Sequence, residues 1–299
     1  MAQKNLRTFA KARTQAKKTA RELWQKGQIA GLGTSRTYED GLKLVGDWMR
    51  QHGGGALHEL SLKRAHQYLS ERASQVSQST LDRDRQAIQS LLQHTGKLTL
   101  EQRLQVIKAE QQQTLKPRAY TPQQVSAIRE RMAPHNALGL ELAHAAGLRA
   151  HELFTLARRD EATPDQRPVD PAKFAGHNDH TRYIVIGKGG LIREVSIPDY
   201  LAARLEAVRL DQPRTVRGRG ILYQQRYAVG GGQALSQAFG ATSRSVLGYS
   251  MGLHGVRHSY AQQRHYDVQR LVGDPERALR IVSQEIGHFR AQITEVYLR

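Results

Sequence analysis

The 299-residue sequence has no cysteine, which excludes disulfide bonds and thiolate metal sites. It also has no apolar run long enough to span a membrane, and its N-terminus lacks the apolar core of a secretion signal. Acidic residues are scarce: 27 Asp and Glu stand against 45 Lys and Arg, so the formal net charge is +18. We therefore expect a cytoplasmic, nucleoid-associated protein with no membrane partner, and its charge favours nucleic acid over a purely small-molecule substrate.

The N-terminal segment is strongly basic and weakly patterned. Residues 1–30 carry eight Lys or Arg residues and a single acidic residue, Glu22. Their apolar residues give only a loose helical stripe. Two interpretations fit equally well: a flexible, solvated basic arm, and an arm that follows a phosphate backbone.

Residues 31–112 show the apolar spacing of short helices. Three stripes follow candidate capping residues near positions 35, 61 and 77, and Leu100, Leu104 and Ile107 mark a fourth. Four helices with one apolar face each predict a compact bundle. Residues 113–120 are polar and lack an apolar period, so we expect a linker between two domains there.

Residues 121–299 form the second predicted domain, which is mainly helical with one small sheet. Thr121-Pro122 starts one helix, and another ends at Gly147, a candidate left-handed position. The runs 184–186 and 195–197 flank Gly187-Lys188-Gly189-Gly190 and predict a β-hairpin. Further helices are expected from about 150, at 199–210, 233–247 and 253–264, after Asp274-Pro275 and at 291–298. Residues 160–181 and 214–220 are expected to be a polar loop and a basic turn.

One pair of residues in this domain suggests phosphate chemistry. His254 and Arg257 lie three residues apart, so a helix over 253–264 places both side chains on one face. A guanidinium beside a proton-transfer group suits a phosphodiester that is about to be broken. Taken alone, however, this spacing is more often found on a solvated basic helix face.

Further motifs accompany this pair. Upstream stand Gly147-Leu148-Arg149-Ala150-His151-Glu152-Leu153 and Gly187-Lys188-Gly189, and downstream stand Ile286-Gly287-His288 and Tyr297. In this order and spacing the motifs resemble the tyrosine recombinase (phage integrase) family. The resemblance covers about the second half of the chain by motif and the first half by architecture only. It implies a mainly α fold with an N-terminal helical-bundle core-binding domain and a C-terminal, mostly helical catalytic domain that contains a small β-sheet.

The resemblance implies a site-specific DNA recombinase or integrase. Such an enzyme cuts and rejoins DNA through a covalent 3′-phosphotyrosyl intermediate, without metal or ATP. Tyr297 would be the nucleophile, and the covalent bond that it forms would retain the phosphodiester energy. Arg149 and Arg257 would each donate hydrogen bonds to the non-bridging oxygens in the transition state.

The family pattern also assigns the proton transfers. Lys188, at the tip of the predicted hairpin, would protonate the leaving 5′ oxygen. His254 would transfer a proton or donate to the phosphate, and His288 would donate to the phosphate beside Tyr297.

Two residues would support this set. Glu152 would orient Arg149, although an i, i+3 salt bridge without catalytic meaning explains it nearly as well. His258 would be structural. His254 and His258 stand at metal-ligand spacing but lack an evident third ligand, so we expect no metal and no cofactor. Contacts to DNA are expected from the basic residues Lys63, Arg64, Arg83, Arg85, Lys116 and Arg118.

The expected partner is double-stranded DNA, bound by a homodimer at each site and by a homotetramer in the synaptic complex, with an accessory DNA-bending protein as a further candidate. The sequence stops two residues after Tyr297, so contacts between protomers are expected from the final helix or the basic N-terminus. Two alternatives stay open: a DNA-binding architectural protein on an inactive recombinase scaffold, and an enzyme resembling type IB topoisomerases.

Overall fold

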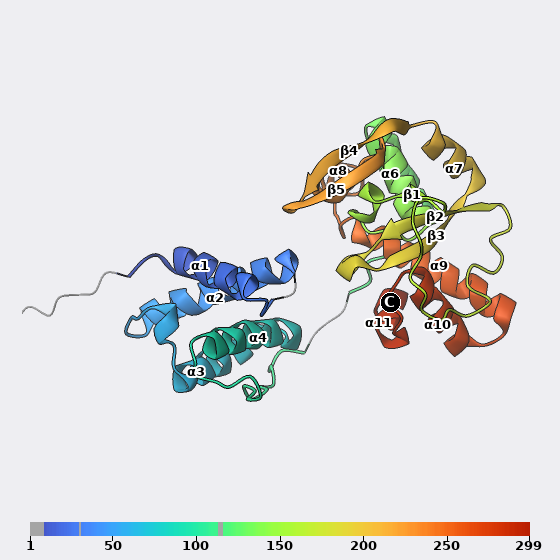
Figure 1. Cartoon of the computed structure of the whole chain (residues 1–299). Coiled ribbons are helices and arrows are strands. Elements are labelled where there is room, and N and C mark those ends of the chain that lie inside the picture. Colours follow the sequence, from blue (N-terminus) through green and yellow to red (C-terminus); the bar gives the residue numbers. More distant parts are fainter. Residues whose placement is uncertain (1–8, 30, 113–115) are drawn as a thin grey trace, which may run out of the picture. The chain divides into compact units, whose positions relative to one another are not determined.

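The computed structural model of the chain describes residues 9–29, 31–112 and 116–299. These residues form two compact units, Met1–Thr114 and Leu115–Arg299, and each is described by itself (Figure 1). The predicted linker, residues 113–120, falls at this division, and its first three residues lie outside the described residues. The expectation of a mainly helical chain is confirmed in both units.

The first unit is a small bundle of helices. Figure 1 shows α1 alongside α2, and α3 beside α4. The buried face of α1 consists of small residues and one leucine, which lets the helix approach α2 closely. At Gly46 of α2 an added Cβ would lie 2.9 Å from the Cβ of Ala12. The helices of this unit are α1 (Ala12–Gln25), α2 (Leu32–Gln51), α3 (Leu62–Ala73) and α4 (Gln78–His94), with a short 3₁₀ helix at Leu57–Glu59.

Two sequence-based expectations differ from this bundle. The predicted basic arm is, over Ala12–Gln25, a helix packed into the unit, whereas residues 1–8 and 30 lie outside the described residues. The helix predicted around Leu100, Leu104 and Ile107 is wrong, because residues 101–109 contain no helix. Side chains of α4 bind this stretch instead: Gln89 accepts from the backbone N–H of Leu104 at 3.1 Å. The fourth position in the bundle is therefore filled by α1.

The second unit contains seven α-helices among its described residues. Thr121 starts α5 with a reciprocal capping box to Gln124, and the Asp274 carboxylate caps α10. The helices are α5 (Pro122–Glu130), α6 (Pro134–Ala145), α7 (Asp199–Glu206), α8 (Gly232–Leu247), α9 (His254–Val272), α10 (Pro275–Glu285) and α11 (Ala291–Glu295), with 3₁₀ turns at Glu152–Phe154, Lys188–Gly190 and Val296–Leu298. The helix predicted to start near residue 150 is thus only a 3₁₀ turn.

Two antiparallel sheets complete the second unit, whereas one was predicted. The first has the order β1-β2-β3, with β1 (Ala157–Arg158), β2 (His180–Ile186) and β3 (Ile192–Pro198). The predicted hairpin is the β2–β3 pair, in which Ile186 lies opposite Ile192. The second sheet pairs β4 (Arg209–Gly218) with β5 (Ile221–Tyr227). It replaces the predicted basic turn at 214–220, and most of its side chains are polar, so apolar alternation did not reveal it.

The predicted polar loop at 160–181 is fastened to the C-terminal helices. Asp170 accepts two hydrogen bonds from Arg277 of α10, both at 2.9 Å, and its backbone N–H donates to Gln284. Farther along, the backbone N–H of Phe174 donates to Glu285 at 2.9 Å.

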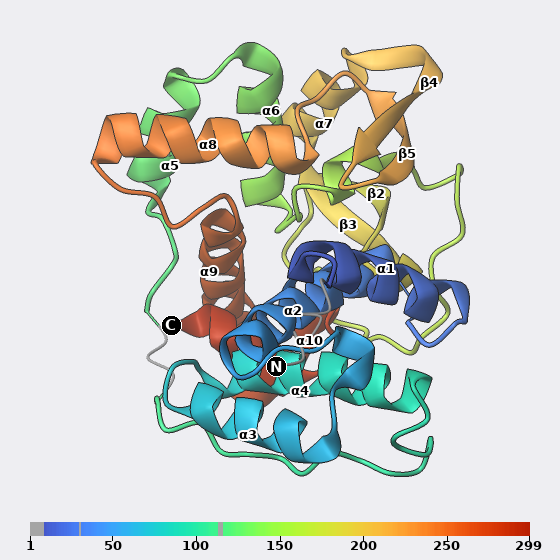
Figure 2. The same cartoon turned by 90° about the vertical axis from the view of Figure 1, so that its left-hand side faces the viewer.

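Figure 2 shows the same units from the side. Among the described residues, none of the helices combines the length and the apolar character that crossing a bilayer demands.

Gly147 follows α6 with φ +59°, as predicted, and Tyr260 of α9 packs directly against it. An added Cβ would lie 2.5 Å from the Tyr260 ring. We expect Gly147→Ala to lose roughly 1–2 kcal/mol through the left-handed backbone and roughly 1–3 kcal/mol more through overpacking. Urea unfolding measures both losses.

Gly248 provides the matched control for this substitution. It also has a left-handed backbone, with φ +79°, but an added Cβ would meet no atom within 4 Å. Gly248→Ala should therefore show the backbone cost alone. Equal losses in the two variants would contradict close packing of Tyr260 on Gly147.

Candidate active site

Tyr297 lies in the C-terminal 3₁₀ turn, with its hydroxyl between two imidazoles. The hydroxyl oxygen is 3.0 Å from Nε2 of His254 and 3.4 Å from Nε2 of His288. Its ring packs on that of His258, with 4.5 Å between the centroids, and the side chain is 7% exposed. The backbone carbonyl of Tyr297 accepts from Gln262 of α9 at 3.0 Å. The structure therefore brings Tyr297 and the three predicted histidines together.

The start of α9 places His254, Arg257 and His258. His254 is the first residue of the helix, so Arg257 and His258 follow about one turn later on the same end. The segment around Tyr120 crosses this end: its backbone N–H and C=O both bond the Ser259 hydroxyl, at 2.8 and 2.7 Å. Because Gly255 lacks a Cβ, the crossing segment can lie directly on the helix. The crossing residues thus hold α9 at the site.

A buried carboxylate gathers the arginines. Glu152 is fully buried and accepts from the Arg149 backbone N–H at 2.8 Å and from the Arg149 guanidinium at 2.7 Å. Arg193 donates to the same carboxylate at 2.8 Å, and Arg257 Nη1 lies 3.8 Å away. Burial raises the pKa of Glu152, but the charges of Arg193, Arg257 and Arg149 outweigh it and lower the pKa to about 2. Glu152 therefore stays ionised and holds Arg149 and Arg257 close together.

Arg257 is enclosed by the protein. Its two terminal nitrogens donate to the backbone carbonyls of Gly147 and Ile286, while its Nε is buried without a hydrogen-bond partner. The guanidinium lies 5.8 Å from the centroid of the Tyr297 ring. Burial lowers the pKa of Arg257 to about 10, which leaves it a cation at neutral pH. Gly147 belongs to the same motif as Arg149, and Ile286 belongs to the same motif as His288. Through these two carbonyls, Arg257 links its own motif to both of the others.

Lys188 occupies the first position of the 3₁₀ turn between β2 and β3. The turn starts at Gly187, whose backbone N–H bonds the Leu191 carbonyl at 2.7 Å. An added Cβ at Gly187 would lie 3.2 Å from the Glu152 carboxylate. The backbone just before Lys188 therefore passes beside Glu152. It belongs to the turn that joins β2 to β3, the strand that carries Arg193.

The imidazoles of the site are uncharged at neutral pH. Burial, followed by the charges of Arg257 and Arg149, lowers the pKa of His288 to about 3. Burial and the charge of Arg257 likewise lower the pKa of His254 to about 4. Neutral imidazoles can accept a proton from a phenol, and an arriving phosphate would stabilise their protonated forms.

The six residues predicted to contact DNA differ in exposure and in the bonds that their side chains make within the protein. Lys63, Arg83, Lys116 and Arg118 are exposed, and Arg118 lies close enough to lower the pKa of His254. Arg64 donates to the carbonyls of Gly54, Met49 and His52, so it serves the bundle as a structural residue. Arg85 is partly buried beside Asp82 and donates to the Leu104 carbonyl.

Arg193 was missed by the sequence analysis. It lies on β3 in phase with Val195 and Ile197, so its side chain points into the unit together with two apolar ones. A charged residue at an inward strand position was the available signal.

In the part of the chain that the structure describes, no three His, Cys, Asp or Glu side chains are grouped as metal ligands.

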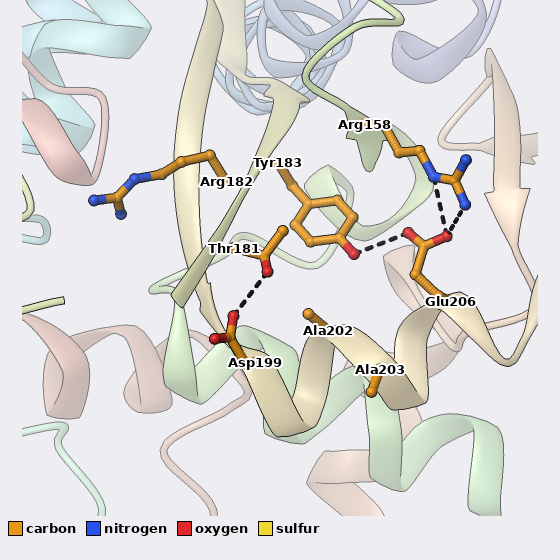
Figure 3. Close-up of a pocket in the computed structure, with 8 residues that line it drawn as sticks. All are labelled: Arg158, Thr181, Arg182, Tyr183, Asp199, Ala202, Ala203 and Glu206. Carbon is orange, nitrogen blue, oxygen red and sulfur yellow. Dashed lines mark hydrogen bonds and ion pairs between the residues drawn. The ribbon is translucent and has the colours of Figure 1, made fainter. Parts of the chain in front are cut away.

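A pocket of about 520 Å³ lies elsewhere on the second unit, against β2 and α7 (Figure 3). Most of its polar side chains are bonded to one another: Thr181 donates to Asp199 at 2.7 Å, and Tyr183 and Arg158 both donate to Glu206, whereas Arg182 points away from them (Figure 3). The residues that line it do not include any of the predicted catalytic side chains. We therefore place the candidate site at Tyr297.

The lowered histidine pKa values predict an acid-sensitive fold. His254 and His288 remain neutral in the folded chain down to about pH 4 and 3, but they protonate near 6.5 once unfolded. The unfolded state therefore binds more protons below pH 6.5, and stability falls as the pH falls toward 4. We expect His254→Gln combined with His288→Gln to flatten the slope of unfolding free energy against pH between 7.5 and 5.

The exposed His135 provides the control for this titration. His135→Gln should leave the slope unchanged, as measured by urea unfolding followed by circular dichroism. An unaltered slope in the double variant would show that the two buried imidazoles titrate alike in the folded and unfolded chains.

The first unit matches a known family, and the whole chain resembles solved structures. Residues 20–95 match the family described as phage integrase, N-terminal SAM-like domain. No curated protein matches the sequence. The XerH site-specific recombinase bound to difH substrate is similar at 16% identity and TM-score 0.55, over 95% of this chain and 81% of XerH.

Two further solved structures give the same result. The Tn1549 transposon integrase in complex with transposon right end DNA has 11% identity and TM-score 0.56, over 95% of this chain and 94% of that one. A lambda integrase tetramer bound to a Holliday junction has 13% identity and TM-score 0.58, over 96% of this chain and 76% of the lambda integrase chain. Residues 20–95 therefore match the phage integrase SAM-like domain, and the chain as a whole has the fold of the tyrosine recombinases.

Proposed function

We propose that the chain cuts and rejoins double-stranded DNA through a covalent 3′-phosphotyrosyl intermediate at Tyr297. One observation carries the proposal: the Tyr297 hydroxyl lies 3.0 and 3.4 Å from two imidazoles, beside arginines gathered by a buried carboxylate. A phenol with nearby proton acceptors and fixed cations is the arrangement that phosphoryl transfer to tyrosine requires.

The first step forms the covalent bond. The Tyr297 oxygen attacks the phosphorus, and its proton passes to Nε2 of His254, the nearer of the two imidazole nitrogens. As the new P–O bond forms, the bond from phosphorus to the 5′ oxygen breaks. The DNA 3′ end is then attached to the protein, and the phosphodiester energy is retained in that bond.

The cations stabilise the charge that develops on the phosphate. Arg149, whose side chain is 18% exposed, and the Nε donor of Arg257 would bind the non-bridging oxygens. Lys188 would supply the proton that the leaving 5′ oxygen takes up. Rejoining reverses these steps when a 5′ hydroxyl attacks the phosphotyrosine, so no ATP is consumed, and the arginines and lysine supply the positive charge without a metal.

Assembly on DNA follows from the same proposal. The lambda integrase relatives are dimers on a core site and a tetramer on a Holliday junction. We propose equivalent homodimers and homotetramers for this chain, acting as a recombinase or integrase on chromosomal or mobile DNA in the cytoplasm. The complete set of Arg149, Lys188, His254, Arg257, His288 and Tyr297 supports an active enzyme over a binding-only scaffold, which has no chemical use for all six.

Tyr297→Phe tests the proposal. The variant loses the attacking oxygen but keeps the ring that packs on His258, so covalent adduct should disappear while affinity for duplex DNA stays within about twofold. Denaturing gels of the protein with labelled duplex fragments measure the adduct, and filter binding measures the affinity. Tyr266→Phe, at a tyrosine 57% exposed on α9, is the control and should form adduct normally. Adduct formed by the Tyr297→Phe variant would refute the assignment.

A further inference from the structure

We infer that Arg193 is a positioning residue of this site: it keeps the Glu152 carboxylate occupied, so that Arg257 keeps the position from which its Nε would bind phosphate. The inference rests on the proposed function, because it concerns the same phosphate site. It goes beyond the six residues implied by the family motifs, none of which is on β3.

Arg193 is held from several sides. Its Nη2 donates to Glu152 Oε2 at 2.8 Å, and its Nη1 donates to the Glu285 carbonyl at 2.6 Å. The side chain is 2% exposed. The turn that leads from α10 to His288 closes over its stem, since an added Cβ at Gly287 would lie 2.7 Å from Arg193 Cδ. A long, flexible side chain is thus fixed in one geometry.

These contacts join the parts of the site. β3 follows the turn that carries Lys188, so the Lys188 hairpin is tied through Arg193 to Glu152. Glu152 holds Arg149, and the Glu285 carbonyl lies at the end of α10, just before His288. One guanidinium therefore sets the spacing between the hairpin, the arginine turn and the histidine turn.

The carboxylate geometry gives Arg193 a more specific task. Glu152 Oε2 accepts from the Arg149 backbone and from Arg193, both at 2.8 Å, whereas Arg257 Nη1 stays at 3.8 Å. That last separation is an ion pair beyond hydrogen-bond length. Without Arg193, Oε2 would lose one donor in a buried setting, and the nearest replacement is Arg257. The guanidinium of Arg257 would then move onto Glu152 and away from the phosphate.

Arg264 offers a matched control in the same unit. It is also buried, and it donates to the Glu285 carboxylate twice at 2.9 Å and to the Ala175 carbonyl at 2.8 Å. It makes no hydrogen bond to Glu152. Replacing either arginine removes one buried ion pair, but only Arg193 occupies the carboxylate that faces Arg149 and Arg257.

The test compares Arg193→Met, Arg193→Lys and Arg264→Met in the full chain, at a temperature where all are folded. We expect Arg193→Met to reduce the single-turnover rate of covalent adduct formation on the order of 10²-fold, as a misplaced catalytic group does. Its affinity for duplex DNA should be unchanged. Arg193→Lys can reach one of the two acceptors, so its rate should lie between those of the wild-type chain and Arg193→Met. Arg264→Met should lower the melting temperature and leave the rate unchanged.

A second readout does not depend on cleavage. In ¹⁵N-arginine-labelled protein the guanidinium resonances of Arg257 should move in Arg193→Met and stay in place in Arg264→Met. If they stay in both variants, or if both variants lose cleavage equally, Arg193 has no positioning role. If the wild-type chain forms no adduct on any DNA, the proposed function fails, and the resonances still decide whether Arg193 positions Arg257.

Discussion

The arrangement of the second unit depends on one buried carboxylate, Glu152. An ionised carboxylate without water is costly unless donors and positive charge surround it; here Arg149 and Arg193 donate hydrogen bonds, and the charge of Arg257 adds to them. Each arginine comes from a different element, so satisfying the charge of Glu152 forces the turn after α6, strand β3 and helix α9 together. The requirement to neutralise one buried anion therefore builds the positively charged site in which we propose that a phosphate binds.

The second feature is the combination of fixed cations with uncharged imidazoles. The same burial that keeps Arg257 enclosed also lowers the pKa of His254 and His288. The arginines can thus meet the phosphate as cations, while the histidines remain able to take a proton from Tyr297. A phosphate entering this site would weaken the repulsion between the arginines and a protonated histidine, so binding and proton transfer would favour each other.

Sequence patterns predicted much of both units. The start of α9, the left-handed Gly147 and the β2–β3 hairpin followed from helical spacing, glycine conformation and two strand-like runs that flank a glycine-rich turn. Arg193 was missed although it is in phase with Val195 and Ile197, because a lone arginine on a strand is usually solvated; its partners Glu152 and the Glu285 carbonyl explain its burial. The packing of α1 was missed for a similar reason: its small alanine face is weakly apolar, and its basic residues, Arg13, Lys17, Lys18 and Arg21, dominate the pattern.

The most direct measurement is to map the covalent link after the full chain is incubated with a pool of duplex DNA fragments. Trapped complexes would be digested, and both the modified peptide and the attached DNA end would be sequenced. We expect a DNA 3′ phosphate on Tyr297, with a free 5′ hydroxyl on the released strand. Attachment through a 5′ phosphate, or to any other residue, would contradict it.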